Sequence, residues 1–232
     1  MLASTKAIVL NSTKFGDTAL ITRLFTEEKG VVSVISNRGK AKSNKNSRLK
    51  VPFSLVDIVF YFKNNTQVHR VKEVSNDKDY NSTNTDIIKS STSFFLAEFL
   101  SKIIREEESN HKLFLFLREQ SLQLNQAVNV DANFILEFIS SILPFIGIEP
   151  HNEGAPDYFD YENGIFTSVQ PTHKNYCKGD LSQNIFLFFE QKSKLNRVER
   201  NACIDALLDY CAVQLQQSFR LKSKEVLDVV FS

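Results

Sequence analysis

The sequence predicts an α+β fold in which the strands come first and the helices follow. The first 75 residues contain short runs rich in β-branched and aromatic residues, and apolar positions beyond about residue 90 recur every three to four residues. A polar, aperiodic stretch, 74–89, separates the two patterns. We therefore expect a barrel domain over residues 1–78 and a mostly helical domain over 79–232, with an irregular insert at about 147–180.

Five segments of the N-terminal part have the composition of strands. Turn-like stretches around Gly16 and Gly30 separate the early segments, and no helical pattern lies between them. Five strands within 80 residues predict a small antiparallel barrel such as an OB-fold. The segments are KAIVLN, TALITRLFT, VVSVIS, VPFSLVDIVFYF and QVHRVKEV.

The fourth segment indicates which side chains fill the barrel, because residues of a small barrel alternate between interior and exterior. One parity is entirely apolar, so we expect it to face inward: Val56, Ile58, Phe60 and Phe62. The opposite parity contains Phe53, Leu55, Asp57 and Tyr61.

The later segments have helical periodicity. Ser and Thr residues near position 90 and Asp131 are candidate caps, and Pro144 is expected to bend or end a helix. Most of the 20 phenylalanines lie in this part, where helical spacing favours core packing over ligand contact.

The formal net charge of +1 conceals an asymmetric distribution. Residues 1–80 contain 14 Lys and Arg against 7 Asp and Glu, a net +7, and residues 81–232 contain 14 against 20, a net −6. Such asymmetry indicates that the first third of the chain meets an anion.

The basic segment, residues 36–55, carries most of this charge between the third and fourth predicted strands. It has no acidic residue, and small residues are interleaved with six cations: Arg38, Lys40, Lys42, Lys45, Arg48 and Lys50. Cations on such a connection suit a phosphate backbone, and aromatic side chains on the barrel surface would stack on bases. Phe53 and Tyr61 are the candidate aromatics, and Lys14 and Arg23 either widen the patch or are simply surface charges.

Two alternatives remain for these residues. The basic segment is also consistent with a solubilising turn that protects a barrel edge. Phe53 and Tyr61 are equally consistent with packing at a domain interface.

The sequence predicts no catalytic residue, metal or cofactor. It lacks a phosphate-binding glycine motif, a nucleophile elbow and a zinc-protease motif. His151, His173 and Cys177 share the irregular stretch, but a structural zinc site normally needs a second close pair of ligands. Three cysteines, no membrane-length apolar run and no signal peptide favour a cytoplasmic protein.

The N-terminal motifs resemble those of the bacterial RecO family. The resemblance rests on AIVL at 7–10, Gly-Asp at 16–17, the LFT-to-Gly turn at 24–30, the basic loop at 38–43 and LKVPF at 49–53. It is specific over about residues 5–60 and generic over the helices, although LKS near the C-terminus is also similar.

The resemblance implies an OB-fold followed by a helical domain in a DNA-repair mediator that is associated with the nucleoid. Such a protein binds single- and double-stranded DNA and anneals complementary strands. With its partner RecR it loads RecA onto DNA coated by single-strand-binding protein, whose acidic C-terminal tail it contacts. Many members carry a four-cysteine zinc module, but the corresponding segment here keeps only Cys177, so zinc is not expected.

Other classes of protein share part of this pattern. An RNA-binding OB protein of translation or RNA processing would have the same charges and strands. A hydrolase with its site within 147–180 would need a clustered His/Asp group there, and a scaffold would carry the basic segment without using it.

Overall fold

The computed structural model describes residues 1–37, 44–80, 86–104, 109–191 and 194–230, and the side chains of residues 44–46 are not described. The chain forms two compact units. The first is Met1–Val130 together with Leu221–Ser232, and the second is Asp131–Arg220. No helix in the described part is long and apolar enough to cross a membrane.

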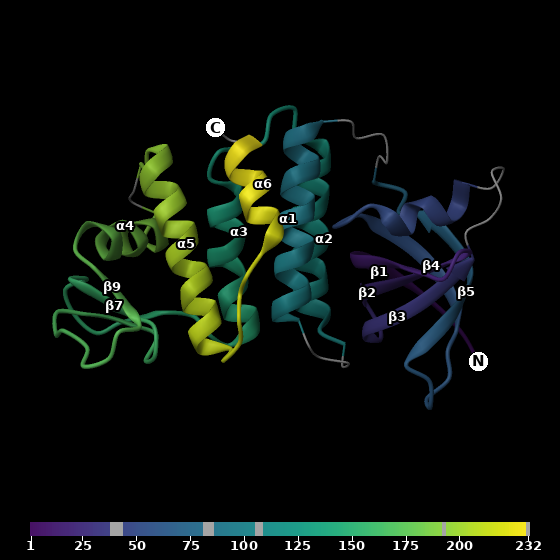
Figure 1. Ribbon diagram of the computed structural model, residues 1–232, viewed down its shortest axis with the longest axis horizontal. Helices are drawn as coiled ribbons and strands as arrows, with labels where there is room; N and C mark the ends of the chain where they lie inside the picture. The colour runs from purple at the N-terminus through teal and green to yellow at the C-terminus, as the bar shows by residue number, and fades with distance from the viewer. Residues whose placement is uncertain (38–43, 81–85, 105–108, 192–193, 231–232) are drawn as a thin grey trace. The chain divides into compact units, whose positions relative to one another are not determined.

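The N-terminal strands close into a barrel with the order β1-β2-β3-β5-β4 (Figure 1). Strands β3 and β5 pair in parallel, and the other neighbours are antiparallel. This is the partly open five-stranded order of an OB-fold, so the predicted fold class is confirmed. The strands are β1 (Leu2–Phe15), β2 (Ala19–Thr26), β3 (Gly30–Asn37), β4 (Leu55–Tyr61) and β5 (Val68–Asn76).

Small and large apolar side chains together fill the barrel. Val56, Ile58 and Phe60 belong to the buried interior cluster, and Phe62 packs against it while partly buried, as predicted. Register shifts in β1 and in the β4–β5 pairing supply the local bends that a closed barrel needs. The interior also contains Ala7, Val9, Leu20, Leu24, Val32, Val34 and Val74.

The connection between β3 and β4 contains a short 3-10 helix, η1 (Asn44–Lys50), which the sequence pattern did not predict. Leu49 is fully buried in the barrel cluster. The hydroxyl groups of Ser12 and Thr22 both donate to its carbonyl oxygen. The second half of the basic segment is therefore fixed to the barrel.

Three helices complete the first unit: α1 (Ile87–Ile103), α2 (His111–Gln126) and α6 (Lys222–Val230). The side chain of Asp86 caps α1 and that of Asn110 caps α2. Helix α1 packs against β1 and α6 packs against α1. Helix α2 meets the barrel through Phe114, whose ring centroid lies 6.2 Å from that of Phe25.

The second unit combines helices with a small sheet. Its helices are α3 (Phe134–Ile142), α4 (Asp180–Phe189) and α5 (Arg197–Gln214). Helix α3 ends one residue before η2 (Leu143–Ile146), which contains Pro144, in agreement with the predicted break.

The segment predicted to be irregular forms a four-stranded sheet in the order β6-β8-β7-β9. Its strands have only two or three residues, which is too short for an alternating pattern to be recognised. Aromatic packing holds the sheet, since Phe159 stacks on Phe166 at 4.6 Å and contacts Tyr210 at 4.9 Å. The strands are β6 (His151–Asn152), β7 (Tyr158–Asp160), β8 (Ile165–Thr167) and β9 (Tyr176–Lys178).

The predicted boundary near residue 78 coincides with the change from strands to helices. The first compact unit nevertheless continues through α2 to Val130, because helices α1 and α2 contact the barrel. That residues 1–78 form a domain of their own remains a prediction.

Candidate nucleic-acid interface

The basic segment is only partly described. Arg38, Lys40 and Lys42 lie outside the described residues, and of Lys45 only the backbone, within η1, is described. Toward the end of η1, Arg48 is half-buried and Lys50 is exposed. Phosphate binding by these six residues therefore remains a prediction.

Phe53 does not fit the predicted role in base stacking. Only 1% of it is exposed, so its ring has no free face for a base. Its backbone nitrogen donates to Val9 O at 2.7 Å, and its carbonyl accepts from Ser121 Oγ on α2 at 2.7 Å. Phe53 therefore packs where the barrel meets α2, which is the alternative that the sequence left open.

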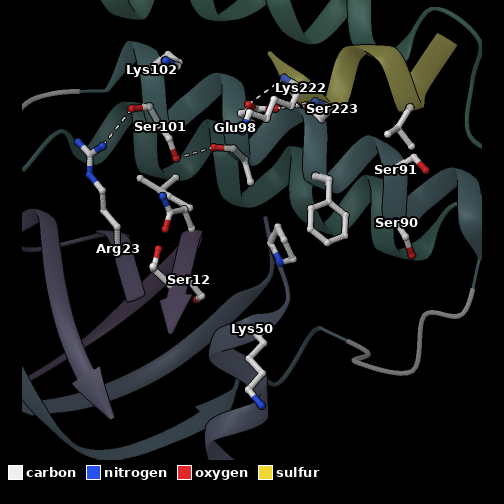
Figure 2. Close-up of a pocket in the computed structure, with 17 residues that line it drawn as sticks. Ser12, Arg23, Lys50, Ser90, Ser91, Glu98, Ser101, Lys102, Lys222 and Ser223 are labelled. Atoms are coloured by element: carbon white, nitrogen blue, oxygen red, sulfur yellow. Dashed lines mark hydrogen bonds between the residues drawn. The ribbon is translucent and has the colours of Figure 1, made fainter. Parts of the chain in front are cut away.

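The side chain of Arg23 is also engaged in contacts within the protein. Its guanidinium donates to Ser101 O at 3.1 Å (Figure 2). It also donates to Ile104 O at 2.9 Å, at the end of α1. A cation here satisfies carbonyl groups that have no partner within the helix. The structure thus places the Arg23 guanidinium against the end of α1 and leaves Lys14 exposed, and phosphate binding by either residue remains a prediction.

A second network ties two more cations of the barrel unit to carboxylates. Lys6 Nζ lies 2.6 Å from Asp77 Oδ2, and Arg118 on α2 lies 3.3 Å from the other oxygen of Asp77. Burial acts to raise the pKa of Asp77, but the hydrogen bond from Lys6 and the nearby positive charges bring it below its usual value. This network joins the end of β5 to α2.

Tyr61 is the candidate aromatic that the structure leaves accessible, with 46% of it exposed. It ends β4 and pairs with Leu2 on one side and Arg70 on the other. A surface cavity of about 610 Å³ lies beside it, and its wall includes three exposed cations: Lys63, Arg70 and Lys72. The sequence analysis missed these cations, although Arg70 and Lys72 alternate with valines in VHRVKEV and so share one parity.

A groove of about 930 Å³ runs between β1, the end of η1, α1 and the start of α6. Apolar side chains on its wall include Phe94 and Val226, each 55% exposed. Lys50, Lys102 and Lys222 also line it. In Figure 2, Glu98 faces the start of α6, where it accepts hydrogen bonds from the backbone nitrogens of Lys222 at 3.1 Å and Ser223 at 2.9 Å.

The second unit contains a His/Asp pair of the kind that a hydrolase would need. His173 Nε2 lies 3.2 Å from Asp160 Oδ1, and its Nδ1 accepts from the backbone nitrogen of Asn175. Nδ1 is thus engaged by the backbone, and Nε2 is buried against Asp160 without a hydrogen bond, so neither nitrogen faces a substrate in this arrangement. Asp160 in turn accepts from the backbone nitrogens of Glu162 and Asn163, so the pair stabilises a turn.

The cysteines show no features of a reactive or metal-binding site. All three are buried and free, and burial raises the pKa of Cys203 and of Cys211 to about 12. Within the residues that the structure describes, no group of three or more His, Cys, Asp or Glu side chains is arranged to hold a metal ion.

These features define the class of protein: an OB-fold barrel with an accessible aromatic residue and exposed cations, extended by a helical part. Comparison with known proteins identifies the family. Residues 1–76 match the family model described as "Recombination protein O N terminal".

Similarity to individual proteins extends along the whole chain. The chain is 33% identical to the DNA repair protein RecO of Bacteroides fragilis over 241 residues, covering all of both chains. With the same coverage it is 31% identical to that of Phocaeicola vulgatus and 30% identical to that of Flavobacterium johnsoniae. The chain belongs to the RecO family of DNA repair proteins, which confirms the resemblance in its N-terminal motifs.

Proposed function

We propose that this protein is a non-enzymatic, DNA-binding mediator of recombinational repair that anneals complementary single strands. One observation carries the proposal. The segment that closes into the OB-fold barrel and matches the recombination family is also the segment with 14 Lys and Arg against 7 Asp and Glu. The excess positive charge therefore lies on the barrel part of the chain.

Annealing is opposed by repulsion between the phosphates of two strands. Cations of the basic segment would lower this barrier for single strands, and the same charges would bind duplex DNA. Both effects weaken as salt screens the charges. The buried Leu49 supports this role, because it fixes one end of the segment to the barrel and leaves Lys50 exposed.

We further propose that the partner proteins are RecR, with which the protein loads RecA, and the single-strand-binding protein that coats the DNA. The acidic tail of the coating protein would dock in the groove beside α1. Exposed Phe94 and Val226 offer apolar contact there, and Lys50, Lys102 and Lys222 complement an acidic peptide.

The basic segment is tested by replacing Arg38, Lys40, Lys42, Lys45, Arg48 and Lys50 together with serine. Each phosphate contact on single strands contributes about 0.7 to the slope of log affinity against log salt. We expect the slope to fall by as much as about four and annealing, followed by fluorescence energy transfer between labelled strands, to slow strongly.

A matched control exchanges each of these Lys for Arg and each Arg for Lys, which keeps the charge and should keep both activities. Unchanged affinity and salt slope in a folded serine variant would exclude the basic segment as the DNA site. Competition by RNA of matched sequence supplies a second check. If RNA displaces DNA at equal or lower concentration, the protein is an RNA-binding OB protein instead.

A further inference from the structure

The outer face of the β4–β5 hairpin carries an aromatic residue, apolar neighbours and free cations on one surface. We infer that this face of the hairpin binds single-stranded nucleic acid, with Tyr61 stacking on an unpaired base and Lys63, Arg70 and Lys72 contacting phosphates. The inference rests on the proposed function, because it assumes that the barrel binds nucleic acid.

Strand register brings these groups together. Leu2, Tyr61, Arg70 and Ile35 form one row across β1, β4, β5 and β3, because each is paired with the next. Residues directly opposite in neighbouring strands point to the same face of a sheet. Tyr61 therefore lies between an exposed apolar side chain, Leu2 at 50%, and an exposed guanidinium.

The cations beside Tyr61 differ from three other cations of the barrel unit. Lys6, Arg23 and Arg118 are bound to carboxylates or to helix carbonyls. By contrast, Lys63, Arg70 and Lys72 are exposed and make no salt bridge with any carboxylate in the described ranges.

One carboxylate lies close to these cations in sequence. Glu73 follows Lys72 and is exposed, but it pairs with Val59 rather than with a member of the row. Three cations against one acid leave an excess of positive charge beside an aromatic ring. This combination suits a single strand, since every base has a face to stack and every nucleotide a phosphate.

Contacts of Phe62, just after β4, and of His69, near the start of β5, hold the hairpin in place. Met1 donates its terminal ammonium to Phe62 O at 3.0 Å, and Lys29 Nζ lies 5.4 Å from the centre of the Phe62 ring. That ring stacks at 4.8 Å on buried His69 at the start of β5. A fixed aromatic platform loses little conformational entropy when a strand binds.

The hairpin surface adjoins the predicted DNA site. Ile35, the β3 member of the row, is followed two residues later by Asn37, the last residue of β3, where the cationic part of the basic segment begins. Two residues of strand span about 7 Å. The β3 end of the row therefore lies about 7 Å along the strand from Asn37.

The first test replaces Lys63, Arg70 and Lys72 with serine in the full chain. We expect the salt slope for binding of oligo(dT) to fall by about two. The site size, which is the number of nucleotides of a long oligo(dT) that one protein occupies in a titration, should decrease. A control variant with Lys174, Lys178 and Lys194 replaced by serine removes three exposed cations from the other unit and should match the parent protein.

The second test uses Tyr61. Tyr61→Ala should weaken binding of oligo(dT) by roughly five- to tenfold and binding of duplex DNA much less, because stacking needs an unpaired base. Tyr61→Phe should restore binding. The chain contains no tryptophan, so Tyr61→Trp supplies a single reporter whose fluorescence should be quenched by the single strand.

The outcomes separate the two proposals. Suppose that Tyr61→Ala and the variant with Lys63, Arg70 and Lys72 replaced by serine both bind as the parent does, while the basic-segment variant loses binding. The hairpin site is then wrong and the proposed function stands. Absence of nucleic-acid binding by the parent protein would instead overturn the proposed function. If the triple variant fails to fold, two other measurements replace it. These are the salt slope of Lys63→Ser, in the hairpin loop, and the fluorescence of Tyr61→Trp, where quenching by the single strand supports the site and its absence contradicts it.

Discussion

Asp160 is a single residue on which the turn between β7 and β8 depends. Its carboxylate accepts from the backbone nitrogens of Glu162 and Asn163 and from Asn163 Nδ2, and it faces His173. Burial acts to raise the pKa of Asp160, but the hydrogen bonds from Asn163 and Glu162 and the charge of His173 bring it below its usual value. The charged form is therefore the one that stabilises the turn.

We expect Asp160→Ala to lower the free energy of unfolding by about 1–3 kcal/mol at pH 7, because buried donors lose their acceptor. A lowered pKa contributes stability above the unfolded value, near pH 4, and this contribution disappears as pH falls through the folded value. The difference between parent and variant should thus shrink in acid, as measured by urea unfolding at several pH values. Exposed Asp157→Ala is the control, and a constant difference at all pH values would contradict this account.

Single residues also show how far the sequence alone predicts which side chains are buried. Alternation correctly assigned Val56, Ile58 and Phe60 to the barrel interior, because that face is buried by the barrel itself. Phe53 and Tyr61 share the opposite parity, yet one is buried and the other exposed. The difference arises because α2 reaches Phe53 through Ser121, and a tertiary contact 68 residues away leaves no trace in local periodicity.

At the scale of elements, α1 packs against strand β1 of the barrel and against the C-terminal helix α6. Glu98 accepts from the first backbone nitrogens of α6 and thereby positions this helix along the groove. The hydrogen bonds from Ser223 and Lys222 more than offset the effect of burial and bring the pKa of Glu98 below its usual value. A groove assembled from β1, α1 and α6 joins segments that are distant in sequence, so no local motif could have predicted it.

The groove makes a specific prediction for partner binding. Phe94→Ser should weaken binding of a peptide that copies the acidic tail of the single-strand-binding protein by about tenfold, because an exposed aromatic ring supplies much of the contact area. DNA binding should stay unchanged. Leu115→Ser on α2 removes an equally exposed apolar side chain outside the groove and is the control. Fluorescence anisotropy measures both affinities, and equal peptide binding by the two variants would place the tail elsewhere.

At the scale of the whole molecule, the buried core does not divide where the strands give way to helices near residue 78. Ile8, Leu10, Phe25 and Phe53 are buried but lie outside the interior cluster of the barrel. Helices α1 and α2 meet this outer side, as the contact between Phe25 and Phe114 shows. The sequence identified the strands of the barrel and the longer helices but not their grouping, because periodicity reports that a face is buried and not what buries it.

This grouping predicts how truncated chains behave. A fragment of residues 1–78 would expose those four apolar side chains, so we expect it to bind a hydrophobic dye and to lack a cooperative thermal transition. Deleting 131–220 and joining 130 to 221 through a Gly/Ser linker keeps the compact unit and should preserve cooperative unfolding. Calorimetry on both chains makes the comparison. A cooperative transition in the short fragment at the temperature of the longer one would show that the barrel is an independent domain, as its sequence predicts.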